Sequence, residues 1–142
     1  EGHRLADEIE QAGDDTDMRS RLPPGVEAFR IIGPLFFGAT SHLEDALRSF
    51  RDTGYPKVFI LRTRLMPMVD ASGVNTLEVF MAQLRKAGTL LILSGLQPQP
   101  TRVLARMGMT EKDGELAFAR DYEHALALAQ EHRERSAEAR VA

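Results

Sequence analysis

The sequence predicts one layered α/β domain, in which a mixed β-sheet of four or five strands is flanked by four to five α-helices. Short apolar runs alternate with amphipathic helical patterns along the chain. A chain of 142 residues that is 43% hydrophobic can also bury a core without metal ions or disulfides. Because the first two strand patterns follow each other with no helix between them, we expect a mixed sheet, with right-handed βαβ crossovers after this pair.

The strands are predicted from apolar runs bounded by turn residues. Residues 26–32 are rich in β-forming residues, and Gly33-Pro34 separates them from a second short run at residues 35–37. Residues 57–61 are continuously apolar after the opening lysine, which is typical of a strand covered on both faces, so they are predicted to form the central strand. The last two strands are expected at residues 89–93 and 116–119.

The helices are predicted from apolar residues spaced three and four apart, together with start and stop signals. Ser41 and Glu44 fit a capping box at the start of the first helix, which Gly54 ends, and Asp121 is expected to cap the last helix. The predicted helices cover residues 41–53, 71–86, 100–107 and 122–133. Their expected core residues include Leu43, Ala46, Leu47 and Phe50, then Val74, Leu77, Met81 and Leu84, and finally Tyr122, Ala125, Leu126 and Ala129.

The two ends of the chain are predicted to lie outside the folded domain. Residues 1–17 contain seven acidic residues and one basic residue, a net charge of −6, so residues 1–22 are interpreted as an acidic flexible linker. The folded domain is predicted at residues 23–135, and residues 136–142 are interpreted as a disordered tail. Because the sequence begins with glutamate rather than methionine, we expect it to be a piece of a longer protein.

The composition argues against several classes of function. The absence of cysteine removes disulfides, thiol nucleophiles and thiolate metal sites. With 18 basic and 21 acidic residues the net charge is −3, so nucleic acid is not an expected partner. The longest apolar stretch is interrupted by glycine and proline and is too short to cross a bilayer. The four histidines lack metal-ligating spacing, and there is no glycine-rich phosphate loop, so we expect no metal, no cofactor and no enzymatic activity.

One motif lies between the predicted central strand and the second helix. Asp70-Ala71-Ser72-Gly73 resembles the Asp-x-Ser/Thr-Gly signature of the STAS family, the domain shared by sulfate transporters and anti-sigma factor antagonists. Four further stretches resemble the form attached to SulP-type anion transporters: Pro24-Gly25-Val26, Gly33-Pro34-Leu35-Phe36-Phe37-Gly38-Ala39, Leu61-Arg62-Thr63-Arg64 and Ser94-Gly95-Leu96-Gln97-Pro98. The resemblance covers roughly residues 23–130.

The resemblance implies a SpoIIAA-like fold and a regulatory, protein-interaction role in the cytosol. It implies a domain at the C-terminus of a bacterial SulP-type secondary transporter of sulfate, bicarbonate or dicarboxylate, at the cytoplasmic face of the inner membrane. Residues 1–22 would then tether it. The implied partners are the transmembrane domain of its own transporter, a homodimer mate, and a soluble acidic protein or nucleotide. The double-phenylalanine stretch favours this branch over the alternative, a stand-alone anti-sigma factor antagonist that acts as a phospho-switch.

The motif is expected to form a loop and the start of a helix, with Ala71 in the first turn. Asp70 is predicted to cap the helix, and Gly73 to allow a close approach to the neighbouring backbone. Ser72 either adds to the cap or is a regulatory phosphorylation site, since first-turn amides and the helix dipole stabilise a phosphate. In anti-sigma factor antagonists the matching serine is the phosphorylation switch.

A polar surface is predicted beside this helix start. Arg62 and Arg64 are two apart and share one face near the end of the central strand, where they either pair with local carboxylates or bind an anion or acidic partner. Asn75 and Glu78 are expected on the outer side of the second helix, beside Ser72. All four are therefore predicted to form one partner-binding patch.

Phe36 and Phe37 are expected on opposite faces of the short second strand, because side chains alternate along a strand. Either both belong to the core, or one of them is an anchor that faces a partner.

Overall fold

Four strands form one parallel sheet. The computed structural model describes residues 22–35 and 41–141. The strands are β1 (Val26–Ile32), β2 (Val58–Leu65), β3 (Leu90–Ser94) and β4 (Leu116–Ala119), and they lie in the order β1-β2-β3-β4. All three neighbouring pairs are parallel.

The mixed sheet that the sequence predicts is not found among these strands, and this part of the prediction is wrong. The chain after β1 does not turn back against it, because Leu35 continues the parallel pairing in an isolated bridge with Val69. The N–H of Leu35 also donates to the carbonyl of Met68 at 2.9 Å. Each connection between the four strands contains a helix, as parallel pairing requires. Residues 36 and 37 lie outside the described residues.

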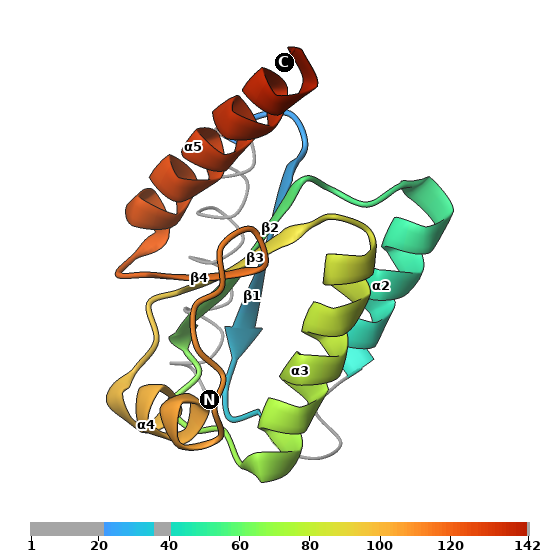
Figure 1. The fold of residues 1–142 in the computed structure, drawn as a ribbon. Coiled ribbons are helices and arrows are strands. Elements are labelled where there is room, and N and C mark those ends of the chain that lie inside the picture. Colours follow the sequence, from blue (N-terminus) through green and yellow to red (C-terminus); the bar gives the residue numbers. More distant parts are fainter. Residues whose placement is uncertain (1–21, 36–40, 142) are drawn as a thin grey trace, which may run out of the picture.

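The helices cover both faces of the sheet (Figure 1). α2 (Ser41–Thr53) and α3 (Ala71–Lys86) lie side by side on one face, and α5 (Tyr122–Val141) lies on the other. α4 (Pro98–Arg106) lies beyond the carboxyl ends of the strands and contacts α3. The predicted α/β fold class is confirmed.

Several element boundaries differ from the prediction, among them those of β2, α4 and α5. β2 continues four residues beyond residue 61 to Leu65, because Arg62 still pairs with both neighbouring strands. α4 begins at Pro98 rather than residue 100, and a proline suits the first turn of a helix because its missing N–H would have no partner there. α5 extends to Val141, whereas the sequence predicts a disordered tail from residue 136.

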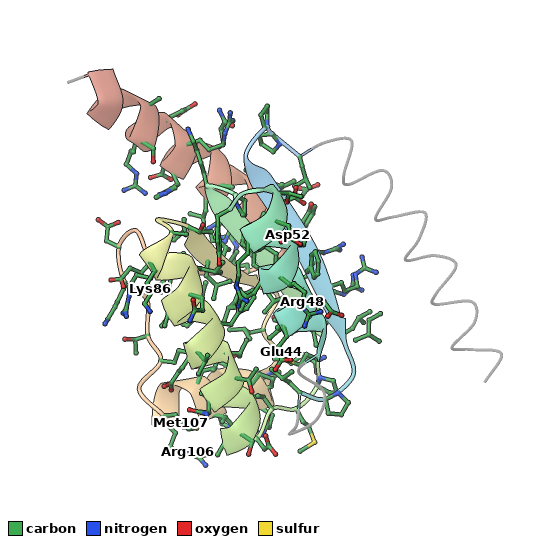
Figure 2. The ribbon with its side chains drawn as sticks, turned by 90° about the vertical axis from the view of Figure 1, so that its right-hand side faces the viewer. Glu44, Arg48, Asp52, Lys86, Arg106 and Met107 are labelled. Atoms are coloured by element: carbon green, nitrogen blue, oxygen red, sulfur yellow. The ribbon has the colours of Figure 1, made fainter. Side chains whose placement is uncertain are left out.

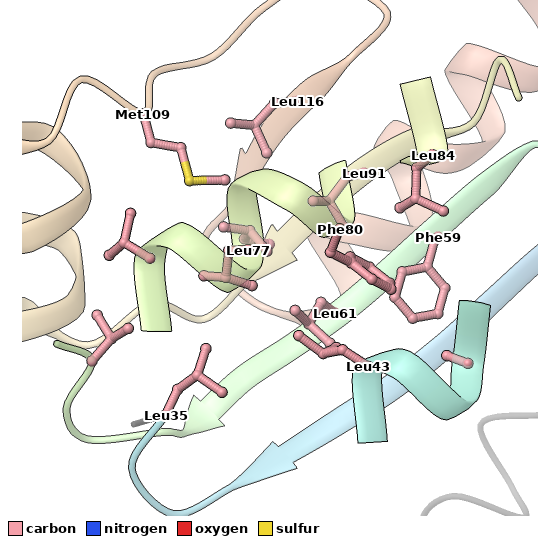
Figure 3. Packing of buried hydrophobic residues seen from close by; sticks show 14 of the residues in the cluster. Leu35, Leu43, Phe59, Leu61, Leu77, Phe80, Leu84, Leu91, Met109 and Leu116 are labelled. Atoms are coloured by element: carbon pink, nitrogen blue, oxygen red, sulfur yellow. The ribbon is translucent and has the colours of Figure 1, made fainter. Parts of the chain in front are cut away.

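The larger core lies between the sheet and the helices α2 and α3 (Figure 3). Phe59 of β2 is at its centre, with its ring centroid 5.5 Å from Phe29, 5.5 Å from Phe50 and 5.3 Å from Phe80. These are contact distances for aromatic pairs. Phe80 is fully buried although the sequence pattern does not select it, while Met81, which that pattern places in the core, is only half-buried.

The second core lies on the opposite face, under α5. Val58 and Ile60 of β2 alternate with the residues that face α3, and they pack with Ala125 and Ala129 of α5. Both alanines have no exposed surface, and their small side chains let the helix lie close to the strands. The predicted inward positions of α5 are therefore confirmed for these two residues.

The outer side of α2 is polar. Glu44, Arg48 and Asp52 follow one another along it at intervals of four residues (Figure 2). Arg48 forms an exposed ion pair with Asp45 at 3.2 Å, which contributes little to stability because both side chains are well solvated. This face is an ordinary solvated surface.

Two buried threonine hydroxyls form hydrogen bonds between neighbouring segments, one from β2 to β3 and one between the loops that precede these strands. Thr63 Oγ1 donates to the carbonyl of Ser94 at 2.8 Å, and Thr89 Oγ1 donates to the carbonyl of Pro56 at 2.6 Å. Both threonines are at most 1% exposed, so these hydrogen bonds satisfy hydroxyls that have lost water.

Candidate functional site

The loop after β2 leads into α3 through Asp70, which caps the helix. Asp70 has an extended backbone, and its Oδ1 accepts a hydrogen bond from the N–H of Gly73 at 2.8 Å. This bond satisfies one of the first-turn amides that have no acceptor within the helix. The predicted capping role of Asp70 is confirmed.

Gly73 is the point at which α3 meets the continuation of β1. A Cβ built on Gly73 would collide with the carbonyl oxygen of Leu35 and would lie 2.7 Å from Cγ2 of Val69. The backbone of Gly73 is helical, so it is the close approach that requires glycine here. The close contact predicted at Gly73 is confirmed.

Ser72 is exposed in the first turn of α3, next to the exposed Ala71. Its carbonyl accepts a hydrogen bond from Thr76 Oγ1 at 3.1 Å. Its hydroxyl has no hydrogen-bond partner among the residues that the structure describes. A kinase could reach this hydroxyl, and the N-terminal end of the helix would stabilise the added charge. Phosphorylation of Ser72 remains a prediction.

A second polar region lies on the other side of the sheet. Arg62 and Arg64 line a pocket of about 530 Å³ together with Ser94 at the end of β3 and Arg120 just after β4. The guanidinium of Arg62 lies 4.3 Å from the centroid of the Tyr122 ring, which is a cation–π contact. Arg120 was not selected from the sequence, although it follows a predicted strand whose end shares this edge of the sheet.

The single patch predicted from the sequence is not formed. Arg62 and Arg64 have the strand positions of Val58 and Ile60, which face α5. Ser72, Asn75 and Glu78 belong instead to α3, on the opposite face. Asn75 and Glu78 are both exposed, as predicted, and Glu78 lines a separate groove of about 340 Å³. The predicted site residues Phe36 and Phe37 lie outside the described residues.

The sequence profile of the STAS domain matches residues 18–124. The chain belongs to the STAS family. Its sequence is 32% identical over 101 residues to a protein named "Putative sulfate transporter YvdB" from Bacillus subtilis (strain 168). This match covers 71% of the chain, and the chain spans only 19% of the length of that relative.

Solved STAS structures share the fold. A sulfate transporter family protein from Wolinella succinogenes superposes with a TM-score of 0.69 and 36% identity, over 80% of this chain and 91% of the other. The STAS domain of a SulP transporter from Vibrio cholerae gives a TM-score of 0.68 and 23% identity, over 80% and 87%. An anti-sigma factor antagonist from Thermotoga maritima shares the fold at a TM-score of 0.66 and 13% identity, over 77% and 91%.

Two features are absent from the described part of this STAS domain. None of its helices is both long enough and apolar enough to span a membrane. Within the same residues, no three His, Cys, Asp or Glu side chains are grouped closely enough to bind a metal ion. The candidate sites described above are the capped start of α3 and the arginine-lined pocket.

Proposed function

We propose that this chain is the cytosolic regulatory and protein-interaction domain of a SulP-type secondary anion transporter, located at the cytoplasmic face of the inner membrane. The observation that carries the proposal is the similarity to proteins described as sulfate transporters, at 32% and 36% identity. The likeness to an anti-sigma factor antagonist, at 13% identity, supports the fold alone. Sulfate, bicarbonate and dicarboxylates are the candidate transported anions.

We further propose that the domain is not an enzyme and works by docking. Its partners are the membrane domain of its own transporter, the dimer mate, or a soluble acidic protein or nucleotide. An apolar surface at the carboxyl edge of the sheet supports docking: Ile32 is 60% exposed, Leu65 38% and Met68 46%. The two segments that carry them run side by side, since the N–H of Gly33 donates to the carbonyl of Leu65 at 2.8 Å. Exposed apolar groups gathered in this way are typical of contact surfaces.

The test uses the full-length parent protein in cells that lack their own uptake of the anion studied. Uptake of labelled sulfate, bicarbonate and a dicarboxylate is compared between the full protein and a form that lacks residues 22–141. We expect one of the three anions to be taken up by the full protein, and its uptake to fall when the domain is removed although the membrane domain is still inserted. A parent protein that stays in the soluble fraction would contradict the proposal.

Substitutions at this apolar edge of the sheet test the docking surface directly. Replacing Ile32 and Met68 with serine should reduce uptake while leaving the fold intact, because both side chains are largely exposed. The matched control is Val79→Ser on α3, which is 54% exposed but lies away from this edge. Equal uptake by the two variants would show that the edge is not the docking surface.

A second candidate function is a phospho-switch of the anti-sigma antagonist type. The accessible hydroxyl of Ser72 at the start of α3 favours it. Ser72→Asp and Ser72→Ala should then differ from each other in partner affinity or in uptake, with little change in stability. If both variants match the wild-type protein in uptake and in partner affinity, Ser72 has only a structural role.

A further inference from the structure

Three segments of the chain meet at the carboxyl end of the sheet. They are residues 32–35 after β1, residues 64–70 between β2 and α3, and residues 97–108, which contain α4. The first segment is joined to the second by two backbone hydrogen bonds, of 2.8 and 2.9 Å. The third is joined to the second by hydrogen bonds from the side chains of Gln97 and Gln99. The three segments therefore form one surface, the α4 end of the domain.

The α4 end carries most of the large apolar side chains that the described residues expose. Five such side chains are exposed in that part of the chain, and four of them belong to the α4 end: Ile32, Leu65, Met68 and Met107. The fifth, Val79, lies on α3. Because a helix rises about 1.5 Å per residue, Met107 lies about 12 Å along α4 from Gln99, which binds the loop after β2. The exposed apolar edge described above therefore continues to the far end of α4.

The α4 end is also basic. Its three segments contain one acidic residue, Asp70, and three arginines, Arg64, Arg102 and Arg106. All three arginines are exposed, and within the described residues none of them forms an ion pair. The carboxylate of Asp70 caps α3, where the positive end of the helix dipole offsets its charge. Beside Arg64, the neighbouring pocket adds two arginines and two carboxylates, so it leaves the excess of positive charge unchanged.

We propose that the α4 end binds the surface of a bilayer that contains anionic phospholipid. Exposed aliphatic side chains beside arginines suit this boundary, because the aliphatic groups enter the acyl region while the guanidinium groups bind lipid phosphates. A bilayer also receives apolar side chains that lie far apart, whereas a protein partner needs a pocket for each of them. The inference rests on the docking role and membrane location proposed above, and it names a lipid surface as the partner of the apolar edge.

Vesicle binding of the 142-residue chain tests this proposal. Sedimentation is compared for vesicles of phosphatidylcholine alone and of phosphatidylcholine with phosphatidylglycerol, over a titration of lipid. We expect binding at least about tenfold tighter with phosphatidylglycerol, and weaker binding in high salt, because salt screens the arginines. A spin-labelled lipid in the same vesicles should broaden the NMR signals of the Met68 and Met107 amides before that of Lys86. Figure 2 shows Lys86 at the end of α3 far from Met107.

Charge variants test the basic part of the surface. Arg102→Ala/Arg106→Ala should weaken binding to the anionic vesicles about twenty-five-fold, since an arginine near such a surface contributes roughly fivefold. The matched control is Arg51→Ala/Lys86→Ala, which removes the same charge from the last turns of α2 and α3. All four side chains are exposed, so both variants should keep the urea midpoint of the wild-type protein.

Apolar variants test the rest of the surface. Ile32→Ser/Met68→Ser should weaken binding about tenfold, because less apolar surface leaves water. The control Val79→Ser, at an exposed apolar site on α3, should bind as the wild-type protein does.

The outcomes separate this proposal from attachment to a transporter. Loss of vesicle binding in both α4-end variants, but in neither control, supports the proposal. Equal binding to the two kinds of vesicle, or broadening that is strongest at Lys86, would overturn it. If no vesicle binds the chain while Ile32→Ser/Met68→Ser still lowers uptake by the full-length parent, the lipid partner is wrong. The apolar edge then docks to protein, and the proposed function stands.

Discussion

Replacing Gly73 with alanine tests the central packing contact of the motif. In an ordinary helix interior, glycine to alanine stabilises by about 1 kcal/mol, because alanine has the higher helix propensity. Here the new methyl group would collide with the carbonyl oxygen of Leu35 and lie 2.7 Å from Cγ2 of Val69. Overpacking of this kind costs about 1 to 3 kcal/mol. Because one obstacle is a backbone atom, which cannot rotate away, we expect the upper end of this range.

The expected net loss is therefore about 2 kcal/mol, the difference between the collision and the gain in helix propensity. For a domain of this size it corresponds to a fall in melting temperature of roughly 6 to 8 °C. Urea unfolding gives the same quantity as a shift in midpoint at constant slope. The matched control is Asn75→Ala, at an exposed site of the same helix, which should stabilise by about 0.5 kcal/mol.

A second substitution, Val69→Ala, tests which of the two contacts causes the loss of stability. In a chain that already carries Val69→Ala, the change Gly73→Ala should cost less, because one of its two obstacles has been removed. The carbonyl oxygen of Leu35 remains, so part of the cost should persist. A Gly73→Ala variant as stable as the wild-type protein would refute the reasoning, since the close approach would then be unnecessary.

Three further predictions concern stability. Asp70→Ala should lose about 1 kcal/mol with the cap, whereas Asp70→Asn, which can still accept from the helix, should lose little; urea midpoints compare them. Thr89→Val should lose about 1 to 2 kcal/mol, because the buried carbonyl of Pro56 loses its donor, while Thr89→Ser should retain most of it. Burial, followed by the charge of Arg135, lowers the pKa of His132 below 6.5, so its contribution to stability is present above about pH 6.5 and is lost as the pH falls through the folded-state pKa. His132→Gln should flatten this pH dependence in unfolding midpoints, and an unchanged profile would contradict it.

The helices and the capped motif could be predicted because their signals are local. The predicted bounds of α3 agree with the structure at both ends, since Asp70 caps its start and Gly88, with a φ of +79°, follows its end. Leu77 and Leu84 are fully buried, as the spacing of apolar residues predicts. Phe80 was missed because its burial depends on ring contact with Phe59, which lies on a strand distant in sequence.

The faces of the sheet could not be predicted because they depend on strand length and long-range register. Because the central strand was predicted to end at residue 61, the sequence did not indicate whether Arg62 and Arg64 lie on the α5 face of the sheet or on the α3 face. Arg120 lines the pocket because β3 pairs in parallel with β4, which makes Ser94 the register partner of Ala119. That pairing links residues far apart in the chain, so neither composition nor periodicity encodes it visibly.

The structure separates two candidate sites that the sequence analysis predicts as one patch. Ser72 lies on the α3 face of the sheet and the arginine-lined pocket on the α5 face, so a phosphate on the serine cannot occupy the pocket. What joins them is the chain from β2 to α3. Gln99 of α4 holds this loop, since its side chain accepts from the N–H of Val69 at 3.0 Å and donates to the carbonyl of Val69 at 3.1 Å. Gln97, the residue before α4, donates to the carbonyl of Arg64 at the other end of this segment, so the start of α4 is hydrogen-bonded to the chain both at the end of β2 and just before α3.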